Sequence, residues 1–218
     1  MSIAHACAPF LDVAHRTVDR DSSFTPRELR TLRALKTPAG IQRFVDDMPY
    51  HIGTTAWSPR RVLAERTAHC LEVYIFAAAA LRVLGRPPLV MCLEAEADTD
   101  HVIAVWRENG AWGAIGASNY ATCRFRSPVY RSLRELALSY FEGYFNLRRE
   151  RTLRAYCKPI DLGRFDDRAW TTSPRDVWFV VDALFAQRYT PLLTPKMRAS
   201  LVRVDQRMFD AGLTGHRH

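Results

Sequence analysis

The sequence has 218 residues, 48% of them hydrophobic, with a formal net charge of +8 and a pI near 9.6. This length and apolar content suffice for one substantial core, so we expect a single domain. The longest apolar run lies between Glu72 and Arg82, far short of the roughly 18 residues of a membrane-spanning helix, so no membrane partner is expected. The basic residues, nearly all arginine, are spread along the chain, and nucleic-acid binding is therefore not expected either.

The start of the chain and the cysteines indicate the compartment. Residues 1–17 contain neither a basic leader nor an unbroken apolar segment, so we expect a cytoplasmic protein. The five cysteines are an odd number and widely spaced, which favours reduced thiols over a disulfide framework.

The N-terminal part carries helix start signals. Thr25-Pro26 and Thr37-Pro38 each place a capping threonine before a proline, which predicts helices over 26–36 and 38–48. With the weakly periodic residues 1–24, they form a helical preface over 1–57. Ser58-Pro59 predicts another short helix at the start of the next region.

The central region, 58–126, combines a buried helix with a small sheet. Residues 70–84 contain only two charges and end before Gly85, which predicts a helix buried nearly all round. Apolar segments at 89–93 and 101–106 predict strands, and Asn109-Gly110 predicts a hairpin into a third strand over 112–115.

The C-terminal region, 127–218, is predicted to be helical and part of the same domain. An apolar stripe over 133–144 indicates one helix, and proline start signals indicate two more over 173–188 and 195–211. The chain as a whole predicts an α+β fold, in which a long buried helix packs on a small antiparallel sheet enclosed by other helices.

Three residues of the central region predict a nucleophilic site. Cys70 falls in the first turn of the buried helix, where the helix dipole and free backbone N–H groups favour a thiolate. A thiol nucleophile also needs a base, and the base needs an orienting polar group. His101 opens one hairpin strand and Asn119 follows the end of its partner, so antiparallel pairing brings them alongside each other. Ser118 is the less favoured alternative to Asn119.

The segments around these residues resemble the transglutaminase-like branch of the papain-like cysteine fold. The resemblance covers 58–126, and the stretch from 128 to 165 resembles a bacterial subgroup of that superfamily. The motifs that carry it are Ala68-His69-Cys70-Leu71-Glu72, Asp98-Thr99-Asp100-His101-Val102-Ile103 and Asn109-Gly110-Ala111-Trp112-Gly113.

The resemblance implies acyl transfer without a cofactor, on a peptide, amide or acyl-carrier substrate. Hydrolysis of the acyl-enzyme would make the protein a peptidase or amidase, whereas an amine acceptor would give a newly formed amide. Such domains usually place an aspartate shortly after the tryptophan of the second strand, where this chain has Ile115-Gly116-Ala117 before Asn119. Either Asn119 replaces that aspartate or the triad is incomplete. The second case implies a catalytically inactive binding or scaffolding module.

Further candidates surround the triad. Arg124 and Arg126 follow Asn119 and have the donor geometry to hold a substrate carboxylate, although a solvated strand face is the plain alternative. Trp57 is a third substrate-binding candidate. The Cys70 backbone N–H is one oxyanion donor, and candidates for the second are Gln42, Tyr50 and Trp57.

The remaining polar residues of the region have simpler interpretations. Cys92 and Cys123 lie in apolar segments and are predicted to be core residues. His69 points about 100° away from Cys70 on a helix and is interpreted as a local packing group. Asp98 and Asp100 are interpreted as turn residues. A zinc site is not expected, because Cys70, His69, Cys92 and His101 lack any metal-ligand spacing.

Overall fold

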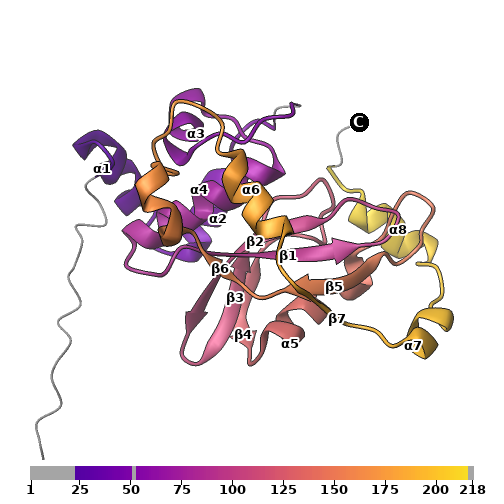
Figure 1. Ribbon diagram of the computed structural model, residues 1–218. Coiled ribbons are helices and arrows are strands. Elements are labelled where there is room, and N and C mark those ends of the chain that lie inside the picture. The colour runs from indigo at the N-terminus through magenta and orange to yellow at the C-terminus, as the bar shows by residue number, and fades with distance from the viewer. Residues whose placement is uncertain (1–22, 51–52, 216–218) are drawn as a thin grey trace, which may run out of the picture.

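Figure 1 shows the computed structural model, which describes residues 23–50 and 53–215. Almost all of the expected lead-in over 1–24 lies outside the described residues. Helices α1 (Pro26–Ala34), α2 (Pro38–Asp46) and α3 (Pro59–Glu65) occupy the predicted positions. Thr25 and Glu28 form a reciprocal capping box at the start of α1, and the Thr37 hydroxyl accepts from the Gly40 N–H in α2. The proline start signals therefore predicted this part correctly.

Helix α4 (Cys70–Val83) is the centre of the fold. Every residue from Glu72 to Leu81 is buried, as the nearly charge-free sequence predicted. Gly85 follows the C-terminal end of the helix with a φ of +80°, and the Arg86 N–H donates back to the Leu81 carbonyl at 2.9 Å.

A single antiparallel sheet supports this helix, and within the described residues it has seven strands in the order β4-β3-β2-β1-β5-β7, with β6 also paired to β1. The predicted hairpin is present between β2 and β3, and both turn residues, Asn109 and Gly110, have positive φ. The strands are β1 (Leu89–Ala95), β2 (His101–Glu108), β3 (Ala111–Ile115), β4 (Arg126–Tyr130), β5 (Leu153–Cys157), β6 (Ile160–Asp161) and β7 (Tyr189–Pro191).

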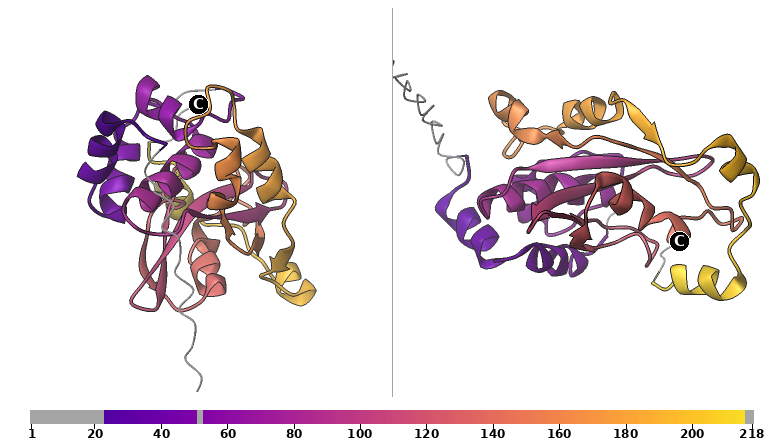
Figure 2. Two further views of the ribbon diagram at one scale, coloured as in Figure 1. Left: turned by 60° about the vertical axis from the view of Figure 1, so that its left-hand side comes forward. Right: turned by 90° about the horizontal axis from the view of Figure 1, so that it is seen from below.

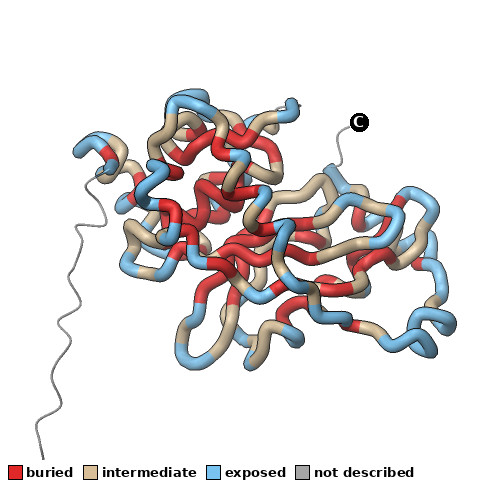
Figure 3. The backbone as a smooth tube through the Cα atoms, in the orientation of Figure 1, coloured by how far each residue is buried: buried red, intermediate tan, exposed pale blue. Residues whose placement is uncertain are grey.

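Helix α4 lies against β1 and β2, and α1, α2 and α3 pack around it. Figures 1 and 2 show these four helices, coloured indigo to purple, grouped together beside the sheet. Figure 3 shows that the buried backbone follows α4 and the central strands. The architecture is α+β, as predicted. The first turn of α4 lies at the edge of the hydrophobic core, because Cys70 is partly exposed whereas the residues from Glu72 to Leu81 are buried.

The C-terminal region is less helical than predicted. The stripe over 133–144 forms α5 (Leu133–Leu138) and a 3₁₀ turn, η1 (Phe141–Gly143), and a second 3₁₀ segment is η2 (Leu162–Arg168). The expected helix over 173–188 is shortened to α6 (Trp178–Phe185). The expected helix over 195–211 is divided into α7 (Pro195–Ala199) and α8 (Gln206–Gly212).

The prediction of a purely helical 127–218 segment is therefore corrected, because β5, β6 and β7 extend the sheet beyond β1. These strands pair with β1 or with one another over long sequence separations, which helix periodicity does not reveal. Within the described ranges, no helix is long and apolar enough to cross a membrane.

Candidate active site

A pocket of about 510 Å³ opens where the first turn of α4 meets the ends of β2 and β3. The three residues of the predicted triad all line it. The described lining residues include Cys70, His101, Asn119, Ser118, Tyr50, Asp98, Asp100, Tyr120, Cys123, Tyr144 and Arg148. The structure thus brings together residues from three separate segments of the central region, as the sequence predicted.

Cys70 is the first residue of α4, and His69 caps the helix. The His69 Nδ1 accepts from the Leu71 N–H at 3.2 Å, while the His69 N–H donates to Glu72 Oε2 at 3.1 Å. This capping arrangement fixes the backbone on both sides of Cys70. His69 is therefore a structural group, as interpreted from the sequence.

Tyr50 reaches Cys70 from a preceding segment. Tyr50 forms a parallel bridge with Ala68, and the Thr67 hydroxyl donates to the Pro49 carbonyl at 2.6 Å. These contacts hold Tyr50 beside the start of α4, where its hydroxyl is a hydrogen-bond partner of the Cys70 thiol.

Burial raises the pKa of the Cys70 thiol above its ordinary value. The Tyr50 hydroxyl and the backbone N–H groups of the first turn lower that pKa, and the nearby Glu72 raises it, but burial is the largest effect. The thiol is consequently protonated at neutral pH. The expectation that the helix start would favour a thiolate is corrected, since desolvation of the half-buried sulfur outweighs the dipole and its hydrogen bonds.

His101 is 6% exposed. Burial lowers its pKa to about 4, assisted by the charge of Arg126 and opposed by backbone hydrogen bonding to Cys123. The imidazole is therefore neutral at pH 7. Its Nε2 is buried and has no hydrogen-bond partner among the described residues, so this nitrogen is available to accept a proton.

Gly116 forms the wall against which the His101 ring packs. A Cβ at this position would lie 3.1 Å from His101 Nε2 and 3.1 Å from Ile103 Cγ2. Gln42 binds the backbone of Gly116: its Nε2 donates to the Gly116 carbonyl at 3.0 Å, and its Oε1 accepts from the Gly116 N–H at 3.2 Å. Gln42 thus holds the wall of the site, and its amide is engaged there instead of facing a substrate oxyanion.

The segment after β3 carries Asn119 into the pocket. Ser118 forms a local turn, in which its hydroxyl accepts from the Tyr120 N–H at 3.0 Å. Asp100 accepts from the Ala95 N–H at 2.8 Å, and Asp98 accepts from the Thr152 hydroxyl at 2.6 Å. The two aspartates are turn residues, as interpreted, yet both also line the pocket.

The three predicted substrate-binding residues, Trp57, Arg124 and Arg126, are not among the described residues that line this pocket. Arg124 forms an ion pair with Asp46. Arg126 donates to the Ser139 hydroxyl at 3.0 Å, and its guanidinium stacks 3.9 Å from the Tyr140 ring centroid. Trp57 is 9% exposed and packs under the guanidinium of Arg61.

A buried polar cluster beneath Cys70 was not predicted from the sequence. Glu72 is fully buried; its Oε1 accepts from the Thr55 hydroxyl at 2.6 Å and from the Trp57 N–H at 3.3 Å. The same oxygen lies 3.6 Å from His69 Nε2. The only signal for this cluster was an acid in an otherwise apolar helix. It fastens the segment around Thr55 to the base of α4.

Metal-ligating residues do not gather anywhere in the described ranges: no group of three or more His, Cys, Asp or Glu side chains there is arranged to hold a metal ion. Comparison of the sequence with protein-family models and with curated proteins gives no match.

Proposed function

We propose that this protein is a transglutaminase-like enzyme of papain-like fold that catalyses cysteine-dependent acyl transfer. Its substrate is an amide or thioester; Cys70 is the nucleophile, His101 the base and Asn119 the orienting group. The observation that carries the proposal is that these three residues line one pocket, and that the Nε2 of the buried His101 imidazole has no hydrogen-bond partner among the described residues. A nucleophile, a base and a polar orienting group in one concave site are the minimum for this chemistry.

The protonation states favour general-base catalysis over a preformed ion pair. In the resting site both Cys70 and His101 are neutral at pH 7, so proton transfer between them is uphill without a substrate. As Sγ attacks the substrate carbonyl, its proton passes to His101 Nε2, and the imidazolium then protonates the leaving group. Water or an amine attacks the resulting acyl-enzyme and releases Cys70.

Two hydrogen-bond donors near Cys70 are the candidates for stabilising the oxyanion of the tetrahedral intermediate in this proposal. The Cys70 backbone N–H belongs to the first turn of α4, where amide groups have no intrahelical partner. Hydrogen bonding from the Tyr50 hydroxyl lowers the pKa of the Cys70 thiol, and Tyr50 lines the same pocket. Of the three sequence candidates for a second donor, Tyr50 is the one whose position supports the role.

A binding module without turnover is the second candidate function. It is favoured by the raised pKa of Cys70 together with the low pKa of His101, because a protonated thiol and a weak base make poor catalysts unless a substrate alters them.

Detection of an acyl-enzyme tests the proposal. The wild-type protein is incubated with thioester and peptide-amide donors, and the acyl adduct is measured by intact mass and peptide mapping. We expect an adduct on Cys70 that is absent in Cys70→Ala and forms about 10²- to 10⁴-fold more slowly in His101→Gln. Cys123→Ala, which alters another thiol of the same pocket, should keep the adduct. Failure of every donor to acylate the wild-type protein would favour the binding module instead.

A further inference from the structure

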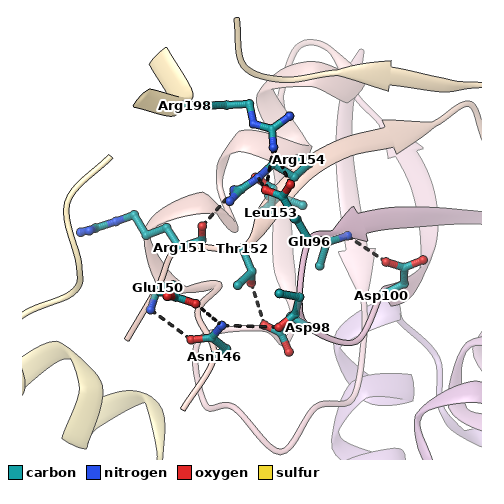
Figure 4. Close-up of polar contacts among 12 residues, drawn as sticks. Glu96, Asp98, Asp100, Asn146, Glu150, Arg151, Thr152, Leu153, Arg154 and Arg198 are labelled. Carbon is teal, nitrogen blue, oxygen red and sulfur yellow. Dashed lines mark hydrogen bonds and ion pairs between the residues drawn. The ribbon is translucent and has the colours of Figure 1, made fainter. Parts of the chain in front are cut away.

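A second pocket, of about 410 Å³, lies beside the first and is rich in arginine (Figure 4). It is formed by the turn after β1, the start of β5, helix α7 and the segment that follows α7. Its described lining residues are Glu96, Ala97, Glu150, Arg151, Thr152, Arg154, Arg198, Leu201, Val202 and Arg203. Its volume falls within the range of roughly 300–1,000 Å³ that is usual for small-molecule sites.

Two guanidinium groups in this pocket converge on one carboxylate. Arg154 Nε donates to Glu96 Oε2 at 2.7 Å, and Arg198 Nη2 donates to both Glu96 oxygens at 2.6 and 2.7 Å. The two arginines come from β5 and from α7, which are far apart in the sequence. These bonds hold the pKa of Glu96 below its usual value. The geometry therefore accommodates an oxyanion between two guanidinium groups.

The arginines are not saturated by this contact. Within the described residues, Arg154 Nη2 and Arg198 Nη1 donate no hydrogen bond. Arg203 is only loosely paired, with 3.9 Å between its Nη2 and Glu150 Oε1. In the ion pairs around the pocket, five arginines share three glutamates, namely Arg148, Arg151, Arg154, Arg198 and Arg203 with Glu96, Glu142 and Glu150.

We propose that this arginine pocket is a second binding site, for the phosphoryl or carboxylate group of a small anionic ligand. Guanidinium forks match the planar or tetrahedral oxygens of these groups and bind them through charge-assisted hydrogen bonds. Glu96 occupies part of the site in the unliganded protein and competes with the incoming anion.

The site adjoins the pocket of Cys70 and His101. Ala97 lines both pockets, and the Thr152 hydroxyl of the arginine pocket donates to Asp98 of the first one at 2.6 Å, as Figure 4 shows. Anion binding itself does not depend on the thiol, so the two proposals can fail separately.

Calorimetric titration with inorganic phosphate, and separately with acetate, tests the site at constant ionic strength. We expect saturable binding of at least one of the two anions, and the tighter one identifies the group. Arg198→Gln with Arg203→Gln, both on partly exposed side chains, should weaken binding about 10-fold or more. The matched control, Arg27→Gln with Arg30→Gln, removes the same charge from exposed positions of α1. It should change the affinity for the anion less than about 2-fold.

Two further variants make the test specific. Glu96→Gln removes the competing charge and should tighten binding about 3-fold or more, whereas Cys70→Ala should bind like the wild type. The proposal is overturned if neither anion binds saturably, if both arginine pairs weaken binding equally, or if Glu96→Gln leaves the affinity unchanged or lower.

Discussion

Gln42 holds the backbone of Gly116 through both its carbonyl and its N–H, at 3.0 and 3.2 Å, and Gly116 in turn packs against the imidazole of His101. Helix α2 therefore takes part in placing the proposed base, although Gln42 itself is absent from the described lining of the pocket. Gln42 is a positioning residue in this arrangement, because it acts through Gly116.

Gln42→Ala should lower kcat for acyl transfer by about 10-fold or more while KM changes little, because the wall behind His101 loses its support. Gln42→Glu keeps the acceptor for the Gly116 N–H, so its kcat should fall between those of the wild type and of Gln42→Ala. Steady-state kinetics on an acylating donor measure both constants. The control is Gln187→Ala, which removes an amide bonded to the Ala183 carbonyl in α6. If the two alanine variants behave alike, Gln42 has only a general structural role.

The low pKa of His101 predicts a pH-dependent stability. Its folded pKa of about 4 lies below the ordinary value of 6.5, so the unfolded chain binds more protons between these values. The resulting stability is fully present above pH 6.5 and is lost as the pH falls toward 4, by about 2 kcal/mol at pH 5 and about 3 kcal/mol in total. Urea unfolding of the wild type and of His101→Gln at pH 7 and pH 5 measures this. The variant should show a correspondingly smaller loss, and equal losses would contradict the buried neutral imidazole.

Alkylation of Cys70 by iodoacetamide should increase with pH to a midpoint above that of an exposed cysteine, because burial raises the pKa of its thiol. Tyr50→Phe removes a hydrogen bond that lowers this pKa and should move the midpoint higher still. Tyr130→Phe, on β4 and outside the described lining of the pocket, is the control and should leave it unchanged. Peptide-level mass spectrometry measures the rate at each pH. A midpoint below that of a free thiol would indicate a preformed thiolate and contradict the general-base mechanism.

Asn119→Ala should lower the single-turnover acylation rate by about 10- to 1000-fold, because the proposed mechanism assigns the orientation of the imidazole to this amide. Asn119→Asp should be tolerated or more active, since the carboxylate adds a charge that stabilises the imidazolium. Ser118→Ala removes only a hydroxyl that accepts from a local N–H and serves as the control. If Ser118→Ala slows acylation while Asn119→Ala does not, the orienting group is Ser118.

Local signals made much of the fold predictable. Thr25 and Thr37 cap their helices through bonds within one turn, and Asn109-Gly110 supplies the two positive φ angles that a tight hairpin needs. The buried helix α4 follows directly from its lack of charge. In each case the physical cause lies within a few residues of the signal.

Non-local pairing explains what the sequence did not reveal. Strand β5 has five residues, with the charged Arg154 among them, and joins the sheet only because β1 offers its free edge. The candidate site likewise has features that local signals predict and others that depend on contacts between distant segments. That Cys70, His101 and Asn119 line one pocket was predictable from their places at element ends, whereas Gln42 contacts Gly116 across 74 positions of the chain. Arg124 and Arg126 were assigned to substrate because nothing in the sequence shows their partners Asp46 and Ser139.

The strand order has a consequence for association between chains. The sheet ends on β4 at one side and on β7 at the other, and both edge strands are short and contain a proline, Pro128 and Pro191 respectively. Proline has no N–H to donate to an added strand, and a short edge gives little length for pairing. The β4 and β7 edges are thus poor templates for a further strand, which protects the sheet at these two edges against edge-to-edge aggregation.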